Sequence, residues 1–147
     1  MQTPTDVTRT ATVHWEGDVA RGKGTVKAES GFVTADYSFG TRFSGDPGTN
    51  PEELLAAAHA SCFTMALSLA LTRDGHPPTS IDTKASVHLH RDDQGVTIPR
   101  IDLSTTVTAP GVDAEEFQRL ANGAKQNCPV SRALNAVEIE LDARLNP

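Results

Sequence analysis

The longest apolar stretch of the chain, residues 50–71, carries the pattern of a helix. Asn50 is a suitable N-cap, Pro51 suits the first helical position, and acidic residues follow in the first turn. Apolar residues then recur at intervals of three and four, which places them on one helical face. This predicted stripe consists of Leu55, Ala58, Cys62, Met65 and Leu69. We therefore expect one central helix of about 33 Å, packed closely on its neighbours.

Shorter segments ahead of this helix alternate between apolar and polar residues and are separated by glycine-containing turns. This pattern is typical of antiparallel strands joined by tight turns. The expected strands cover residues 7–15, 25–28 and 32–37. Residues 40–49 hold three glycines and a proline, so we expect a loop that leads into the helix.

The chain beyond the helix predicts a hairpin, two helices and a last strand. Pro99 interrupts the second strand of the hairpin and indicates an edge or a bulge. Asp113 is the expected cap of the next helix. The expected elements are strands 81–91 and 96–108, helices 114–126 and 130–135, and strand 137–145. The order βββ-α-ββ-αα-β predicts an α+β fold in a single domain, residues 1–147.

Composition narrows the range of functions. The 147 residues carry a scattered net charge of −6, with no basic patch, so we expect no nucleic-acid partner. The chain starts without a basic and apolar leader, so we expect no secretory signal. Charged Glu52 and Glu53, together with His59, make the long apolar stretch a poor membrane span, and we expect no membrane partner. Two cysteines in such a chain predict a reducing, cytoplasmic location.

Each cysteine has a chemical and a structural interpretation. Cys62 is either a small buried apolar residue or a reactive thiol with a cation nearby. Arg42 and Arg21, in glycine-flanked segments, are the candidate cations, although either can be an ordinary surface charge. Cys128 precedes Pro129 where a helix restarts, so the helix dipole favours its thiolate, unless it merely caps that helix.

A metal site is a weaker alternative. His59 and Cys62 form an H-x-x-C pair, and Cys128 supplies a third soft ligand. Three protein ligands plus water are sufficient for catalytic zinc. A C-x-x-C redox pair is absent from the sequence.

Two cysteine-containing segments carry a resemblance to a known family. Residues 48–63, GTNPEELLAAAHASCF, resemble the signature of the osmotically inducible OsmC proteins and their organic hydroperoxide resistance (Ohr) relatives. Residues 127–131, NCPVS, resemble the second cysteine motif of that family. Segments 14–17 and 21–25 are similar to the opening of the OsmC branch, and residues 80–83 and 110–113 also match.

The resemblance implies a cysteine peroxidase in stress defence that works without cofactor or metal. Its expected fold is an intertwined homodimer with antiparallel sheets around long central helices. Its expected substrates are organic hydroperoxides and, more weakly, hydrogen peroxide, with a lipoylated protein or another dithiol as reductant. An intrachain disulfide would form in each cycle. The implied roles are peroxidatic Cys62, resolving Cys128, thiolate-activating Arg42 (alternatively Arg21) and arginine-orienting Glu52 (alternatively Glu53).

Helix geometry adds one constraint. Glu52 and Cys62 are ten residues apart on one helix, or about 15 Å along its axis. A Glu52 that serves Cys62 must therefore come from a second copy of the chain. The alternatives to a peroxidase are a thiol redox sensor without turnover and a ligand-binding domain with structural cysteines.

Overall fold

The computed structural model describes residues 5–147, which form two compact units. The first ends at Pro51, and the second is Glu52–Pro147. The elements follow the predicted order, with one additional short helix, and confirm the α+β class. The assignment of residues 1–147 to a single domain stays a prediction.

The first unit contains the predicted antiparallel meander. Its strands are β1 (Ala11–Glu16), β2 (Lys23–Ala28) and β3 (Thr34–Tyr37), in the order β1-β2-β3. The first strand begins four residues later than the alternation indicated. In the middle strand, Gly24 lies between the rings of Trp15 and Tyr37. A Cβ at this glycine would lie 2.3 Å from the tyrosine ring, so only glycine lets the two aromatic residues flank the strand.

Helix α1 (Phe39–Phe43) replaces the first part of the expected loop 40–49. Ser38 and Thr41 form a reciprocal capping box, in which each side-chain oxygen accepts a hydrogen bond from the other's backbone N–H. This Ser-x-x-Thr pair fulfils the local role that Ser-x-x-Glu usually has. Gly40 inside the pair, and Gly45 and Gly48 after it, gave this segment the composition of a loop.

The second unit is built on a sheet in the order β4-β5-β6. Strands β4 (Ser80–Asp92) and β5 (Gly95–Thr108) form the predicted hairpin. Their register shifts between His88 and His90, opposite the stretch that contains Pro99. The bulge predicted from this proline is therefore confirmed. Beyond it, β5 becomes the central strand of the sheet.

Strand β6 (Glu138–Leu145) pairs with β5 in parallel. The expectation of antiparallel sheets therefore holds for the first sheet, whereas the second sheet is mixed. A parallel neighbour requires a crossover connection, which α3 (Ala114–Asn127) and α4 (Pro129–Ala133) supply. Asp113 caps α3 as predicted, accepting a hydrogen bond from the backbone N–H of Glu116.

Helix α2 (Pro51–Arg73) starts at the predicted residue, but its buried face differs from the predicted stripe. Met65 and Leu69 are 76% and 49% exposed. The fully buried residues recur at intervals of four: His59, Phe63, Leu67 and Leu71. A helix rich in alanine and leucine has more than one apolar stripe, so spacing alone could not identify the face that packs.

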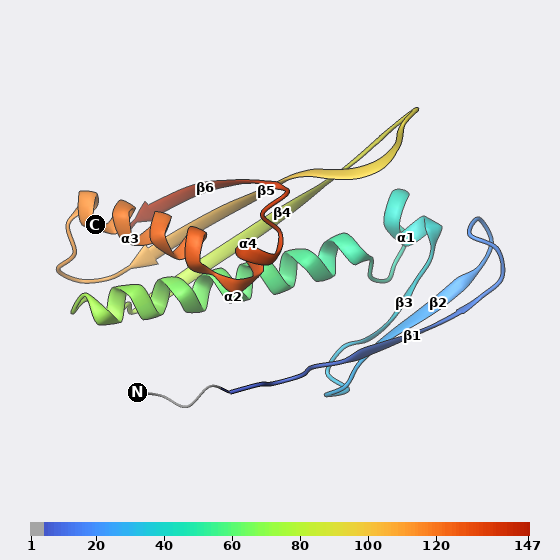
Figure 1. The fold of residues 1–147 in the computed structure, drawn as a ribbon, viewed down its shortest axis with the longest axis horizontal. Helices are drawn as coiled ribbons and strands as arrows, with labels where there is room; N and C mark the ends of the chain where they lie inside the picture. Colours follow the sequence, from blue (N-terminus) through green and yellow to red (C-terminus); the bar gives the residue numbers. More distant parts are fainter. Residues whose placement is uncertain (1–4) are drawn as a thin grey trace. The chain divides into compact units, whose positions relative to one another are not determined.

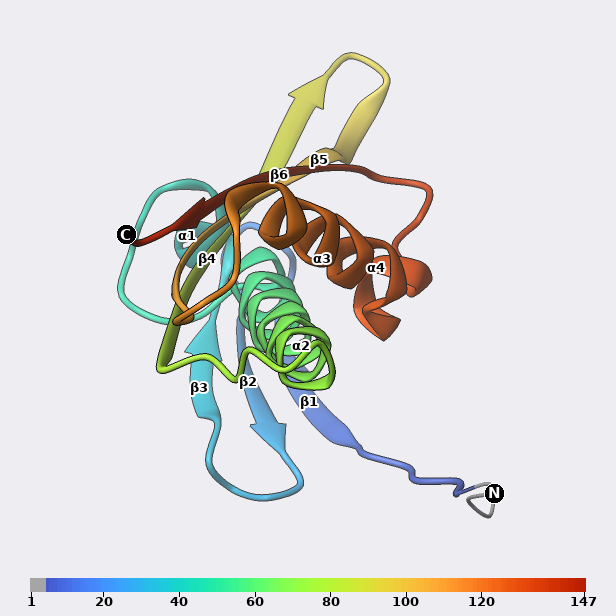
Figure 2. The ribbon, with the colours of Figure 1, turned by 90° about the vertical axis from the view of Figure 1, so that its left-hand side faces the viewer.

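The core of the second unit lies between α2, α3 and the sheet, with both helices along one face of it (Figures 1 and 2). By length and composition alone, α2 could also cross a membrane. Core helices of soluble proteins can have the same length and composition. Here Phe63 and Leu67 pack in one apolar cluster with Leu103 and Phe117, as expected for a core helix.

Candidate functional site

The two cysteines meet in the second unit although 66 positions separate them in the sequence. Cys62 lies in the middle of α2 and is partly buried, whereas Cys128 is fully buried. Cys128 ends α3 and begins α4, and its backbone N–H donates to the carbonyl of Ala124 at 2.9 Å. Both thiols are free and lie close enough to interact with each other. The fold therefore brings together the two residues that the sequence singled out.

The pKa of Cys62 is raised within this chain, mainly because burial disfavours the thiolate. The backbone N–H of Val130 donates to the Cys62 sulfur and lowers the pKa, while the neighbouring Cys128 raises it again. Within this chain, burial therefore works against the thiolate form of Cys62. Activation of this thiol by a cation stays a prediction.

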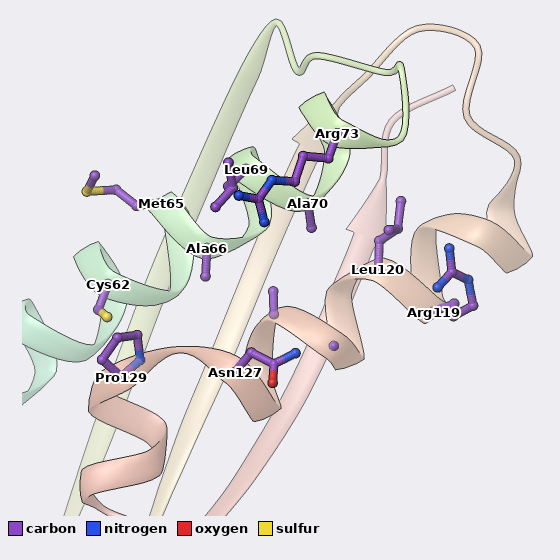
Figure 3. A pocket seen from close by; sticks show the side chains of 12 residues that line it. Cys62, Met65, Ala66, Leu69, Ala70, Arg73, Arg119, Leu120, Asn127 and Pro129 are labelled. Carbon is purple, nitrogen blue, oxygen red and sulfur yellow. The ribbon is translucent and has the colours of Figure 1, made fainter. Parts of the chain in front are cut away.

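An apolar groove of about 670 Å³ opens beside Cys62, between α2 and α3. Figure 3 shows the cysteine beside Pro129 at one end and two arginines, Arg73 and Arg119, toward the other. Met65 and Leu69, which the predicted stripe had placed in the core, line this groove instead. A small organic molecule can therefore reach the thiol along an apolar surface.

The predicted charged residues do not form a cluster with Cys62 inside the second unit. Glu52 is buried in the first turn of α2, about 15 Å along the axis from Cys62, and Glu53 beside it is exposed. Arg42 and Arg21 belong to the first unit. The guanidinium carbon of Arg42 lies 5.5 Å from the centroid of the Phe43 ring. The roles assigned to these four residues stay predictions.

The weak metal alternative finds no support in the arrangement of side chains. Among residues 5–147, no group of three His, Cys, Asp or Glu side chains is placed to hold a metal ion. Nε2 of His59, one of the three ligands considered, instead lies 2.7 Å from Oγ of Ser131.

This contact between His59 and Ser131 is a feature that the sequence interpretation missed. Both residues are buried, and they connect α2 to α4. Burial lowers the pKa of His59, so the ring is neutral at pH 7. Each of the two residues lies three positions from a cysteine, but this spacing does not indicate that their side chains meet.

Two free thiols in contact at an apolar groove define a protein suited to cysteine chemistry. The family model of the OsmC-like proteins matches residues 43–142, and the chain belongs to this family. The resemblance inferred from the two cysteine motifs is thereby confirmed.

Individual relatives agree with this assignment. The chain is 55% identical over 133 residues to the peroxiredoxin OsmC of Escherichia coli, covering 90% of this chain and 92% of that protein. It is 32% identical over 102 residues to the organic hydroperoxide resistance protein OhrB of Bacillus subtilis, covering 68% and 73%. The names of both relatives agree with the predicted class, a cysteine-based peroxidase.

Solved structures show the same fold. An organic hydroperoxide resistance protein from Elizabethkingia anophelis matches with a TM-score of 0.76 and 27% sequence identity. The match covers 98% of this chain and all of that one. The crystal structure of B. subtilis OhrB matches with a TM-score of 0.67 at 28% identity, covering 93% and 98% of the two chains.

Proposed function

We propose that this protein is a cytoplasmic thiol peroxidase that reduces organic hydroperoxides and, more weakly, hydrogen peroxide. The observation that carries the proposal is the pair of free, neighbouring thiols, Cys62 and Cys128, beside an apolar groove. The names of the relatives, a peroxiredoxin and an organic hydroperoxide resistance protein, support the same activity.

In the first step, the Cys62 thiolate attacks the distal oxygen of R–O–O–H. The O–O bond breaks, the sulfur becomes a sulfenic acid, and the alkoxide takes up a proton to leave as an alcohol. Cys62 is the more accessible of the two sulfurs, since Cys128 is fully buried. Met65 and Leu69 give the organic part of the substrate an apolar surface, which favours organic hydroperoxides over hydrogen peroxide.

In the second step, Cys128 attacks the sulfenic sulfur. An S–S bond forms, the S–O bond breaks, and the thiol proton leaves with the hydroxyl group as water. Contact between the two sulfurs before the reaction favours this intrachain route. An external dithiol, such as that of a lipoylated protein, then reduces the disulfide by exchange and becomes a disulfide itself.

Activation of Cys62 requires a cation, because burial raises the pKa of its thiol within one chain. We assign this role to Arg42, with Arg21 as the alternative, and assign to Glu52 the orientation of the guanidinium through paired hydrogen bonds. Glu52 is about 15 Å along the helix from its own Cys62. The proposed active form is therefore an intertwined homodimer, in which Glu52 and Arg42 of one copy serve Cys62 of the other.

The test is peroxide consumption by one preparation under four conditions. Cumene hydroperoxide and hydrogen peroxide are each offered with dihydrolipoamide and with a monothiol. We expect many turnovers with the dithiol, faster with cumene hydroperoxide than with hydrogen peroxide. Oxidation that stops after one equivalent with either reductant would indicate a redox sensor. Slow alkylation at neutral pH, together with no consumption, would indicate structural cysteines.

A further inference from the structure

The hydrogen bond between His59 and Ser131 joins two elements that are far apart in the sequence. Nε2 of His59 lies 2.7 Å from Oγ of Ser131, and the two residues are 0% and 5% exposed. Nδ1 of the same ring has no hydrogen-bond partner within residues 5–147. This bond is the only one between side chains of α2 and α4 found among the described residues.

The bond lies directly beside the reacting sulfurs. His59 and Cys62 are three residues apart on α2, so their side chains are neighbours on the helix surface. The segment 128–131 contacts this turn of α2 at three points: the Cys128 thiol, the Val130 N–H and the Ser131 hydroxyl. The first two contacts end on the Cys62 sulfur. The bond from Ser131 to His59 involves neither sulfur.

A histidine at this position is unexpected on packing grounds alone. Phe63, Leu67 and Leu71 continue the same buried face at intervals of four, and an apolar residue would complete it. A buried imidazole with one unpaired nitrogen is less favourable than such a residue unless its other nitrogen has a role. The one contact that the ring makes through that nitrogen is with the turn carrying Cys128.

We infer that His59 is a positioning residue for disulfide closure, holding the Cys128 turn against Cys62 through Ser131. The inference rests on the proposed peroxidase function. When Cys62 becomes a sulfenic acid, both contacts that end on its sulfur change, whereas the bond from His59 to Ser131 persists. Cys128 then stays in place to form the S–S bond with release of water. His59 neither gives nor takes a proton in this step.

Closure of the disulfide competes with a second oxidation of Cys62, so the rate of closure determines how much sulfinic acid forms. A sulfenic acid that has not yet formed the disulfide can react with another hydroperoxide, giving a sulfinic acid and a second alcohol. Loss of the anchor lowers the fraction of time that Cys128 spends within reach of the sulfenic sulfur. We therefore expect slower closure and over-oxidation at lower peroxide concentration, with the attack step less affected.

The key variant is the double substitution His59→Leu with Ser131→Ala. It removes both polar partners, so no buried group is left unpaired and stability stays close to that of the wild type. Rapid mixing with cumene hydroperoxide follows alcohol release for attack, and mass spectrometry follows the Cys62–Cys128 disulfide and the sulfinic acid. We expect closure to slow about tenfold, the effect of one ordinary hydrogen bond, and attack to change less than threefold.

The single variants and a matched control sharpen this test. Ser131→Ala and His59→Leu each remove the same bond, so their effects on closure should not add in the double variant. The control is Thr105→Val, which removes a buried hydroxyl bonded to Thr83 and to the carbonyl of Asp82, within the sheet. It should close its disulfide at the wild-type rate.

Two outcomes would overturn the inference alone: wild-type closure in the folded double variant, or equal slowing by Thr105→Val. A wild-type protein that forms no Cys62–Cys128 disulfide would instead overturn the proposed function, and the inference with it.

Discussion

The two units of the chain differ in what they bury. In the second unit, α2, α3 and the sheet enclose an apolar cluster that includes Phe63, Leu67 and Phe117. Among residues 5–51 of the first unit, no residue with an apolar side chain is buried. The buried positions there are Gly22, Gly24, Thr41 and Thr49. A three-stranded sheet without an apolar core of its own is marginal in stability.

The units also differ in chemistry. The second unit contains both thiols, their contact and the groove, yet burial raises the pKa of Cys62 in that environment. The first unit contains Arg21 and Arg42, the candidate cations, and a sheet that needs another surface to cover it. The comparison supports the proposed homodimer, in which one copy supplies the thiols and the other supplies the charge.

The largest effect is expected from Cys62→Ser. The serine hydroxyl is not ionised near pH 7 and does not attack the O–O bond, so peroxide consumption should fall to the background rate. Circular dichroism should show the fold unchanged, because the substitution replaces one small, partly buried atom. Cys128→Ser is the comparison variant: it should release one alcohol per site and then accumulate Cys62 as sulfenic or sulfinic acid. Sustained turnover by folded Cys62→Ser would refute the peroxidatic assignment.

The second largest effect is expected in a test of which copy of the chain supplies Glu52 to each site. We consider mixed dimers formed by refolding Cys62→Ser chains together with Glu52→Ala chains. One site of a mixed dimer carries both substitutions and is inactive, whereas the other combines an intact Cys62 with an intact Glu52 from the partner copy. Activity should therefore return to about half the wild-type value per mixed dimer, provided that Glu52→Ala alone is severely impaired.

The matched control refolds each parent by itself, which should restore nothing. If Glu52 served the Cys62 of its own chain, every site in a mixed dimer would carry a substitution and mixing would not restore activity either. Size-exclusion chromatography of the refolded samples establishes that dimers have formed before activity is compared.

The sequence predicted much of the fold because its signals are local. Turns, caps and alternation located the elements, and Pro99 located a bulge. The parallel pairing of β6 was not predictable in this way, since strand direction depends on the crossover rather than on the strand's own residues. The prediction of which face of α2 is buried was wrong, because several stripes of this helix are apolar. The sheet and α3 determine which of these stripes packs.

Only the part of the candidate site that lies in recognisable sequence motifs could be predicted from the sequence. The pair Cys62 and Cys128 followed from two segments that resemble one family, and the chain places their thiols together. The bond from His59 to Ser131 could not be predicted from periodicity, because it depends on how α4 packs on α2. The raised pKa of Cys62 depends on burial, which no spacing of residues shows.

A smaller effect should distinguish the two arginines of the first unit. If Arg42 activates the thiolate in the dimer, Arg42→Ala should raise the pKa of Cys62 by about one unit or more, a tenfold loss of thiolate at neutral pH. Arg21→Ala should shift it less. The rate of alkylation against pH, measured on the wild type and both variants, gives the three pKa values. A larger shift in Arg21→Ala would transfer the role to Arg21.

The smallest effect tests the core of the second unit through the pH dependence of stability. Burial lowers the pKa of His59 in the folded protein below its ordinary value of about 6.5 in the unfolded chain. The unfolded state therefore binds the proton first as pH falls, so the stabilising contribution of neutral His59 is present above pH 6.5 and is lost below it. The loss can reach about 1.4 kcal/mol for each pH unit.

The measurement is urea unfolding of the wild type and of the His59→Leu, Ser131→Ala double variant at pH 7.5 and 5.5. Titration of the other groups is common to both proteins and cancels in the difference. Between the two pH values, the wild type should lose up to about 1.4 kcal/mol more stability than the double variant, because only the wild type has the buried imidazole. Equal losses in the two proteins would mean that His59 is protonated as easily in the folded chain as in the unfolded one.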